Sequence, residues 1–258
     1  MSTKIVITKN GQALVVLGAD FQDVMNTIEE KIPFFKAIYF DVNIIKTFEE
    51  AELVKFRGAF HRLIKILREN KVEINLNSIR KQSFLAGKQI IGPKTLSLDY
   101  YNKCNLRCLF CSINSPLMEQ RKNVPAALDL KIIQEILNQA YAIGVETIRL
   151  SSDGEPLLSP DAFFVLQSIA RKGFALNLLT NGVKFRKQHV DLLNKIDKGI
   201  NVLVNFSAAK KNTYQKLHGG KPDDYEAVLR TLAMLARFRQ QKRSRKEFVA
   251  VGTTFIIT

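Results

Sequence analysis

From residue 95 onward, short apolar segments alternate with longer segments in which apolar residues recur at helical spacing. The short segments have the length and composition of strands, and they are Leu96–Tyr100, Thr147–Leu150, Ala175–Leu179, Asn201–Phe206 and Phe248–Ile257. Capping residues, glycines and prolines bound the helices between them, at about 129–143, 159–173, 188–195 and from 224 onward. Strands that alternate with helices predict parallel βα units and an α/β fold. An open sheet could end at the fifth strand, whereas a closed barrel would need at least one more unit.

Residues 1–94 show a different pattern, that of a small α/β domain. The pair Asn10-Gly11 is a strong signal for a hairpin turn, and it lies between two strand-like segments, Lys4–Thr8 and Gln12–Leu17. A helical pattern follows over Asp20–Lys31, and the apolar run Ala37–Val42 has the length of a strand.

A long amphipathic helix comes next. Thr47 and Glu50 have the spacing of a capping box, which predicts the start of this helix. Its apolar positions recur at helical spacing, and they are Leu53, Phe56, Phe60, Leu63, Ile64 and Leu67. The alternating segment Val72–Leu76 predicts a further strand.

These elements suggest a boundary before the βα units. The order strand, strand, helix, strand, helix, strand over residues 1–78 faintly resembles a STAS-type regulatory domain. Residues 79–94 contain Gly87, Gly92 and Pro93, which are typical of a linker. We therefore expect a small domain over 1–78, a linker over 79–94 and a second domain over 95–258.

The composition is that of an ordinary soluble globular protein, with 46% hydrophobic and 24% charged residues among 258. No segment approaches the roughly 18 uninterrupted apolar residues of a membrane span. The first residues, MSTKIVITKNG, lack the apolar region of a secretion signal. We expect a cytoplasmic protein that does not associate with a membrane, and its three cysteines exclude a disulfide-stapled scaffold.

The chain is basic, with 39 Lys and Arg against 24 Asp and Glu and a net charge of +15. The densest run of cations is Arg237, Arg239, Lys242, Arg243, Arg245 and Lys246. Such a run suits a polyanion such as RNA, or the solvated end of a helix, where cations interact favourably with the helix dipole. We favour the helix end, because no nucleic-acid-binding motif accompanies the run.

The three cysteines are clustered. Cys104, Cys108 and Cys111 have the spacing C-x3-C-x2-C directly after a predicted strand, which disfavours three unrelated core cysteines. A structural zinc site would need a fourth ligand, and none of the three histidines of the chain (His61, His189 and His218) is adjacent. Tightly spaced cysteines also suit iron–sulfur clusters. A [4Fe–4S] cluster held by three cysteines would leave one iron open to a small ligand.

The cysteine motif, with Phe110 before its last cysteine, resembles that of the radical S-adenosylmethionine (radical SAM) superfamily. Three further segments follow in the order of that family. Ser152–Leu158 (SDGEPLL) is similar to its Gly-Gly-Glu-Pro element, and Thr180-Asn181-Gly182 ends the third strand. Ser207 ends the fourth strand and is followed by His218-Gly219-Gly220. This fourth-strand region resembles the branch that contains molybdopterin-biosynthesis enzymes and SPASM peptide maturases.

The resemblance covers residues 95–258 and implies a fold. It implies a partial (βα)6 TIM-like radical SAM barrel with about five βα strands present. The small α/β domain that precedes this barrel is not covered by the resemblance. Because the family's barrel has six strands, we expect the chain to be truncated at its C-terminal end.

The resemblance also implies roles for the motif residues. Cys104, Cys108 and Cys111 would bind three irons of a [4Fe–4S] cluster, and the methionine part of S-adenosylmethionine would bind the fourth. The segment Asp153-Gly154-Glu155 would lie beside the methionine ammonium group. The family has a second glycine where this chain has Asp153, so Glu155 is the preferred carboxylate, although Asp153-Gly154 could instead form a plain turn.

Three further residues are candidates for contacts with S-adenosylmethionine. Ser207 would hydrogen-bond the ribose or the methionine carboxylate, and Phe110 would pack near the adenine. Asn181 would either line the site or serve as the left-handed residue of a turn. The histidines receive no catalytic role, and the sequence identifies no catalytic residue, although His218 lies beside the Gly219-Gly220 pair.

The implied reaction is reductive cleavage of S-adenosylmethionine to a 5′-deoxyadenosyl radical that abstracts hydrogen from a peptide or small-metabolite substrate. A reductant of the flavodoxin or ferredoxin type is the expected partner. Two alternatives remain at this point. The basic excess allows a radical SAM enzyme that acts on RNA, and the cysteines allow a non-catalytic zinc-binding module. The sequence does not identify the substrate.

Overall fold

The computed structural model describes residues 4–7, 12–16, 28, 35–118, 125–244 and 248–256. Contacts divide the chain into two units, residues 1–94 together with 138–145, and residues 95–137 together with 146–258. Within the described residues, no helix combines the length and the apolar character that crossing a membrane requires.

The first unit contains a sheet of four strands, in the order in which they occur in the chain. These strands are β1 (Lys4–Ile7), β2 (Gln12–Val16), β3 (Ala37–Asp41) and β4 (Glu73–Ile74). The antiparallel pairing of β1 with β2 confirms the predicted hairpin, and the remaining pairs are parallel. The hairpin residues Asn10 and Gly11, and the predicted helix over 20–31 apart from Ile28, lie outside the described residues.

Helix α2 (Glu50–Glu69) supplies much of the core of this unit. The predicted apolar stripe is buried along its length. The predicted capping box is wrong, because Thr47 ends a short 3-10 helix, η2 (Asn43–Thr47). The helix therefore starts later, and the backbone N–H of Glu49 donates to the Glu52 carboxylate (2.9 Å).

A second helix follows α2 closely. Strand β4 is shorter than the predicted strand over 72–76, because helix α3 (Leu76–Leu85) already begins at Leu76. The Asn75 side chain caps this helix by accepting from the Ser78 N–H (3.0 Å). Leu76, Ile79 and Ser83 are buried, so the first part of the segment 79–94 packs as a helix.

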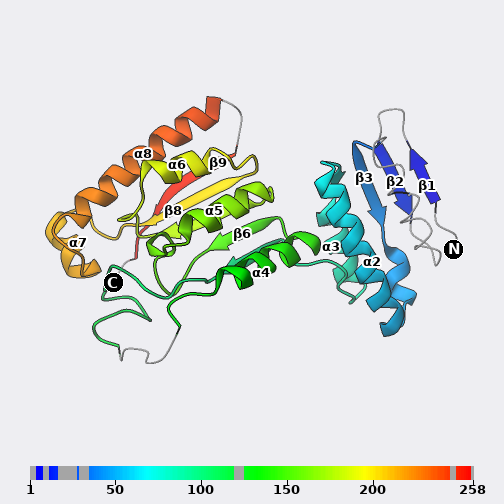
Figure 1. The fold of residues 1–258 in the computed structure, drawn as a ribbon, viewed down its shortest axis with the longest axis horizontal. Coiled ribbons are helices and arrows are strands. Elements are labelled where there is room, and N and C mark those ends of the chain that lie inside the picture. The colour runs from blue at the N-terminus through cyan, green and yellow to red at the C-terminus, as the bar shows by residue number, and fades with distance from the viewer. Residues whose placement is uncertain are drawn as a thin grey trace. The chain divides into compact units, whose positions relative to one another are not determined.

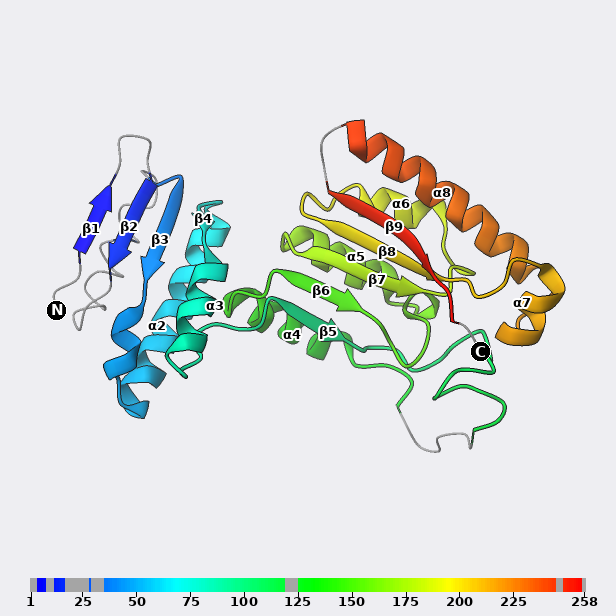
Figure 2. The same ribbon diagram turned by 180° about the vertical axis from the view of Figure 1, so that it is seen from behind.

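The second unit is built on five parallel strands in chain order. They are β5 (Thr95–Leu98), β6 (Thr147–Leu150), β7 (Ala175–Thr180), β8 (Ile200–Asn205) and β9 (Val249–Thr254). One face of this sheet is covered by four helices, α4 (Leu130–Ala142), α5 (Ala162–Arg171), α6 (Lys187–Leu193) and α8 (Asp224–Ser244), as opposite views show (Figures 1 and 2). The arrangement confirms the predicted α/β fold with five βα strands.

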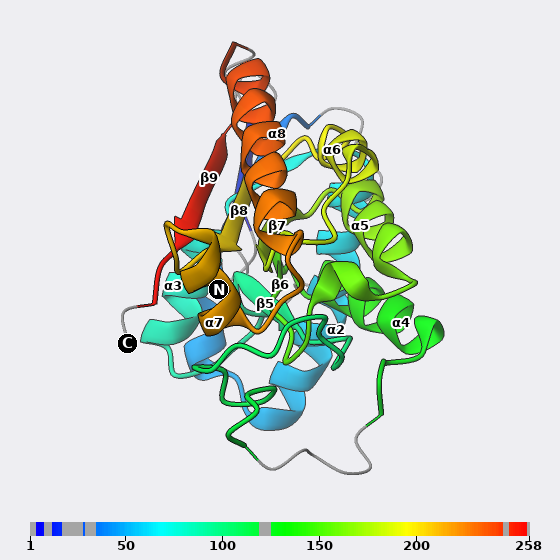
Figure 3. The ribbon, with the colours of Figure 1, turned by 90° about the vertical axis from the view of Figure 1, so that its left-hand side faces the viewer.

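The two faces of the sheet differ in chemistry. Along β8, Ile200, Val202 and Val204 are buried, and the residues between them are partly exposed. Because side chains alternate along a strand, Leu203 and Asn205 lie on the face opposite to these buried residues. A short helix, α7 (Lys211–His218), follows β8 and lies at the end of the sheet where the carboxyl ends of the strands gather (Figure 3).

Candidate functional site

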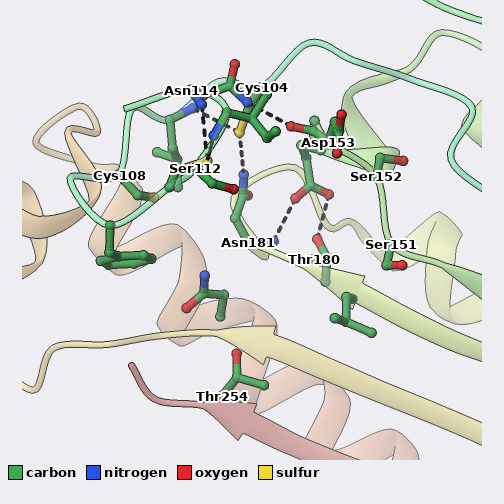
Figure 4. Close-up of a pocket in the computed structure, with 18 of the residues that line it drawn as sticks. Cys104, Cys108, Ser112, Asn114, Ser151, Ser152, Asp153, Thr180, Asn181 and Thr254 are labelled. Atoms are coloured by element: carbon green, nitrogen blue, oxygen red, sulfur yellow. Dashed lines mark hydrogen bonds between the residues drawn. The ribbon is translucent and has the colours of Figure 1, made fainter. Parts of the chain in front are cut away.

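A pocket of about 530 Å³ lies at the carboxyl ends of strands β6 to β9. Its walls come from the cysteine segment, from the segments that follow β6 and β7, and from the ends of β8 and β9. Figure 4 shows Cys104 beside Asn181, and Cys108, Asp153 and Thr180 also line this pocket. The carboxyl edge of parallel strands is the usual place for ligand sites in α/β folds.

All three cysteines line the pocket. The Cys104 sulfur accepts from the backbone N–H of Leu106 (3.4 Å) and from the side-chain amide of Asn181 (3.7 Å). The Cys111 sulfur accepts from the backbone N–H of Asn114 (3.2 Å). Donors of this kind stabilise negative charge on sulfur, as ligation of a metal requires.

Burial makes the thiols of Cys104 and Cys108 weak acids. It raises the pKa of Cys104, and it raises the pKa of Cys108 to about 12 together with the neighbouring charges of Cys104 and Cys111. A metal that binds here must therefore displace protons from the sulfurs.

The cysteine segment is held against the end of helix α7. The Arg107 N–H donates to the His218 carbonyl (3.0 Å), and the Leu109 N–H donates to the Leu217 carbonyl (2.8 Å). Gly219, which ends the helix, has a φ of 60°, and a Cβ there would lie 2.8 Å from the Arg107 carbonyl oxygen. Glycine therefore permits this close approach of the two segments.

His218 is fully buried beside the cysteines. Its Nδ1 lies 3.2 Å from the Cys108 sulfur, and its Nε2 accepts from the backbone N–H of Ser207 (3.2 Å). The ring stacks on Tyr214, with centroids 4.3 Å apart. Burial lowers the pKa of His218 to about 4, so the imidazole is neutral at physiological pH.

Glu155 lies on another wall of the pocket, with 2% of its surface exposed. One carboxylate oxygen accepts from the Thr180 hydroxyl (2.6 Å) and the Leu157 N–H (3.1 Å), and the other accepts from the Asn181 N–H (2.6 Å). Burial raises the pKa of Glu155, and these three hydrogen bonds oppose the rise. The buried carboxylate thus joins the segments that follow β6 and β7.

The residues before Glu155 pack against the cysteine segment. A Cβ on Gly154 would overlap the carbonyl oxygen of Lys103, so glycine is required by close approach. The Asp153 N–H donates to the Asp99 carboxylate (3.0 Å), and the Asp153 carbonyl accepts from the Asn114 side chain (2.8 Å). Ser152 lines the pocket, and its hydroxyl is buried without a hydrogen-bond partner.

The remaining predicted residues lie in different surroundings. Asn181 lines the pocket, and it is not the left-handed residue of its turn, because the positive φ belongs to Gly182. Phe110 also lines the pocket and meets His218 edge-on at 5.3 Å. Ser207 lies behind the wall, where its hydroxyl donates to the Asn205 side chain (3.2 Å) and accepts from the Ile256 N–H (3.1 Å).

Several residues near the pocket were not predicted as site residues from the sequence, among them Asn205, Asn114 and His218. Asn205 ends β8 on the pocket side, and Asn114 follows the cysteine motif closely. Both positions could have been found from the strand alternation and from their nearness to the cysteines. His218 could not, because 110 residues separate it from Cys108.

The chemistry of the donor set fits an iron–sulfur cluster. Among the described residues, no group of three or more His, Cys, Asp or Glu side chains is placed so that it could hold a single metal ion. In a cubane cluster each cysteine binds a different iron, so the sulfurs need not converge on one point. Three cysteines on a pocket wall, with N–H donors directed at the sulfurs of Cys104 and Cys111, meet that requirement.

Comparison with known proteins gives a family match and several relatives. A family model described as the Radical SAM superfamily matches residues 98–247. A probable GTP 3′,8-cyclase from Pyrobaculum aerophilum is 29% identical over 131 residues, which are 51% of this chain and 40% of the relative. The antilisterial bacteriocin subtilosin biosynthesis protein AlbA from Bacillus subtilis is 24% identical over 147 residues, 56% of this chain and 31% of the relative. The matches therefore span less than half the length of these relatives.

Two solved structures of SuiB from Streptococcus suis share the fold. One contains S-adenosylmethionine and the other the precursor peptide SuiA. Each is 18% identical to this chain with a TM-score of 0.50, and each covers 99% of this chain, which in turn covers 56% and 58% of the SuiB chains. At this level of identity the likeness establishes the fold.

Proposed function

Because the chain belongs to the radical SAM superfamily, whose members are enzymes, we propose that it uses a [4Fe–4S] cluster and S-adenosylmethionine to abstract hydrogen from a peptide substrate. The observation that carries the proposal is the pocket in which Cys104, Cys108 and Cys111 lie close to the segment Asp153-Gly154-Glu155. When bound together, the cluster and S-adenosylmethionine supply a 5′-deoxyadenosyl radical.

In this proposal the three cysteines hold the cluster. The N–H donors to Cys104 and Cys111, which include the Asn181 amide at Cys104, would stabilise the thiolates that bind iron. The contacts of the cysteine segment with α7 hold this segment in place before the cluster binds. Binding of the cluster therefore requires little further ordering of the chain.

The segment Asp153-Gly154-Glu155 would receive the methionine ammonium group. A buried carboxylate and carbonyl groups at a strand end are the acceptors that an ammonium group needs. Glu155 adds negative charge from the pocket wall and orients the backbone of Thr180 and Asn181. Ser152, whose buried hydroxyl has no partner, supplies a further polar group.

Phe110, Asn181 and Ser207 would complete the S-adenosylmethionine site. Phe110 offers an apolar ring on the pocket wall for the adenine. Ser207 would act through Asn205, because its own hydroxyl is bonded to the Asn205 side chain behind the wall. The residue types and the position of the pocket support this assignment.

Peptide is the substrate class that the relatives favour. AlbA is named for the biosynthesis of a bacteriocin, and SuiB has been solved with a precursor peptide. A PqqA peptide cyclase from Streptomyces rochei is also 32% identical over 99 residues, 38% of this chain and 26% of the relative. The reductant that we propose is a flavodoxin or ferredoxin, because the chemistry starts with one electron.

The test is anaerobic reconstitution of the full chain with iron and sulfide. We expect about four irons and four sulfides per chain, and loss of this content when all three cysteines are replaced by alanine. A control variant replaces Ser112, which lies beside Cys111 in the same segment, by alanine and leaves the thiols in place. Stoichiometric zinc with no bound iron in the wild-type chain would contradict the proposal.

A further inference from the structure

His218 lies between the cysteine segment and the end of strand β8, and each of its ring nitrogens has a defined neighbour. Nδ1 lies 3.2 Å from the Cys108 sulfur, and Nε2 lies 3.2 Å from the backbone nitrogen of Ser207. The ring is also held by Tyr214, which stacks on it, and by Phe110, which meets it edge-on. Its position is thus fixed from four directions.

The neighbour at Nε2 decides which nitrogen carries the proton. A backbone N–H can only donate, so the Ser207 amide requires a lone pair on Nε2. An imidazole with a lone pair on Nε2 carries its proton on Nδ1. The Nδ1–H then faces the Cys108 sulfur, and it is a donor.

We propose that His218 is a positioning residue whose Nδ1–H donates a hydrogen bond to the Cys108 sulfur and raises the reduction potential of the cluster. The inference rests on the proposed function, because it needs a cluster bound to Cys108. It assigns to His218 a role that the sequence motif does not indicate.

The physical reason is charge. Reduction adds one electron to the cluster and its sulfur ligands, and an N–H donor stabilises the more negative state more strongly. A neutral donor already held by packing stabilises that state with little reorganisation. The His218 carbonyl accepts from the Arg107 N–H as well, so one residue holds both the backbone and a sulfur of the cysteine segment.

Two variants of His218 separate the hydrogen bond from the ring itself. His218→Phe keeps an aromatic ring and removes both nitrogens. His218→Asn places a side-chain amide near the position of Nδ1 and so can restore the donor. The matched control is His189→Phe, because His189 is also buried and accepts a backbone N–H, that of Arg186 (2.8 Å).

The measurement is the midpoint potential of the cluster in each reconstituted chain. It is determined by a redox titration without substrate, monitored by electron paramagnetic resonance. Iron and sulfide content are determined on the same samples. We expect a more negative midpoint for His218→Phe, a return toward the wild-type value for His218→Asn, and the wild-type value for His189→Phe.

Several outcomes would overturn the inference. A wild-type midpoint in a fully loaded His218→Phe variant would do so, and so would an equal shift in His189→Phe. Absence of any cluster in the wild-type chain would instead defeat the proposed function and this inference together. If His218→Phe fails to hold a cluster, nitrogen NMR of labelled histidine in the metal-free wild-type chain decides, and a proton on Nε2 of His218 would contradict the inference.

Discussion

Glu155 and Thr180 form a hydrogen bond that joins the segment following β6 to the end of β7. The Thr180 hydroxyl donates to the Glu155 carboxylate (2.6 Å) and accepts from the Gly182 N–H (3.0 Å). All of these groups are buried. The pair therefore fixes the pocket wall at the cost of keeping a carboxyl group away from water.

Replacing Thr180 by valine should lower the free energy of unfolding of the metal-free protein by about 1–3 kcal/mol, because buried donors and acceptors lose their partners. The loss should grow with pH. Burial raises the pKa of Glu155 above its ordinary value of 4.5, and removal of a donor raises it further. At a pH below that ordinary value the carboxyl group is protonated in both the folded and the unfolded protein. At higher pH, ionising Glu155 costs more free energy in the folded variant than in the folded wild type. Urea denaturation at acidic and neutral pH measures the difference.

The control is Thr231→Val. The Thr231 hydroxyl is buried and donates to the Gly182 carbonyl (2.7 Å), so its loss removes a hydrogen bond without touching a carboxylate. Its effect should be the same at both pH values. An equal pH dependence in the two variants would refute the coupling of Thr180 to Glu155.

At this scale the sequence predicts best where the chemistry is local. Cys104, Cys108 and Cys111 lie within eight residues, so their spacing alone indicates that they bind one metal centre. The contacts of His218 with Cys108 and of Ser207 with Ile256 depend on how distant segments fold together. Spacing in the sequence carries no information about such contacts.

Among the elements, helix α7 and the cysteine segment depend most closely on each other. Two backbone hydrogen bonds join them, and Gly219 ends the helix with a positive φ against the Arg107 carbonyl. The end of this helix therefore serves as the support on which the cysteine segment is ordered.

We expect Gly219→Ala to destabilise the protein by about 2–4 kcal/mol and to reduce retention of iron. About 1–2 kcal/mol comes from the left-handed conformation, and the remainder comes from the clash with Arg107. Gly173→Ala is the matched control, because Gly173 has a φ of 66° with no atom within 4 Å of a Cβ. It should cost about 1–2 kcal/mol and leave iron retention unchanged.

Thermal denaturation gives the two stabilities, and iron analysis after gel filtration gives retention. Equal effects of the two substitutions on both quantities would show that neither stability nor iron retention depends on the close approach of Gly219 to the Arg107 carbonyl.

The elements themselves followed largely from alternation and spacing. The strands β7 and β8 were predicted from their length and apolar composition, and in the structure their residues alternate between buried and partly exposed. The boundary at α2 was wrong, because a 3-10 helix ending at Thr47 competes with the capping signal. Local turns of this kind depend on packing that a capping motif does not describe.

On the scale of the whole molecule, the chain combines two units with different sheets. The unit of residues 95–137 and 146–258 contains the pocket, the cysteines and most of the family match. The other unit has the predicted hairpin and parallel strands, and its likeness to a STAS domain stays a prediction. The role of this unit could not be predicted, because its sequence pattern indicates secondary structure but contains no motif of catalytic or ligand-binding residues.

The central claim is that the cysteines and the opposing pocket wall bring S-adenosylmethionine to a reducible cluster. The most direct measurement is 5′-deoxyadenosine formed when the anaerobically reconstituted full chain is incubated with S-adenosylmethionine and dithionite. We predict that the wild-type chain forms it and that a Cys104→Ala, Cys108→Ala, Cys111→Ala variant forms none above background. A wild-type chain that holds about four irons and yields no 5′-deoxyadenosine would contradict the account.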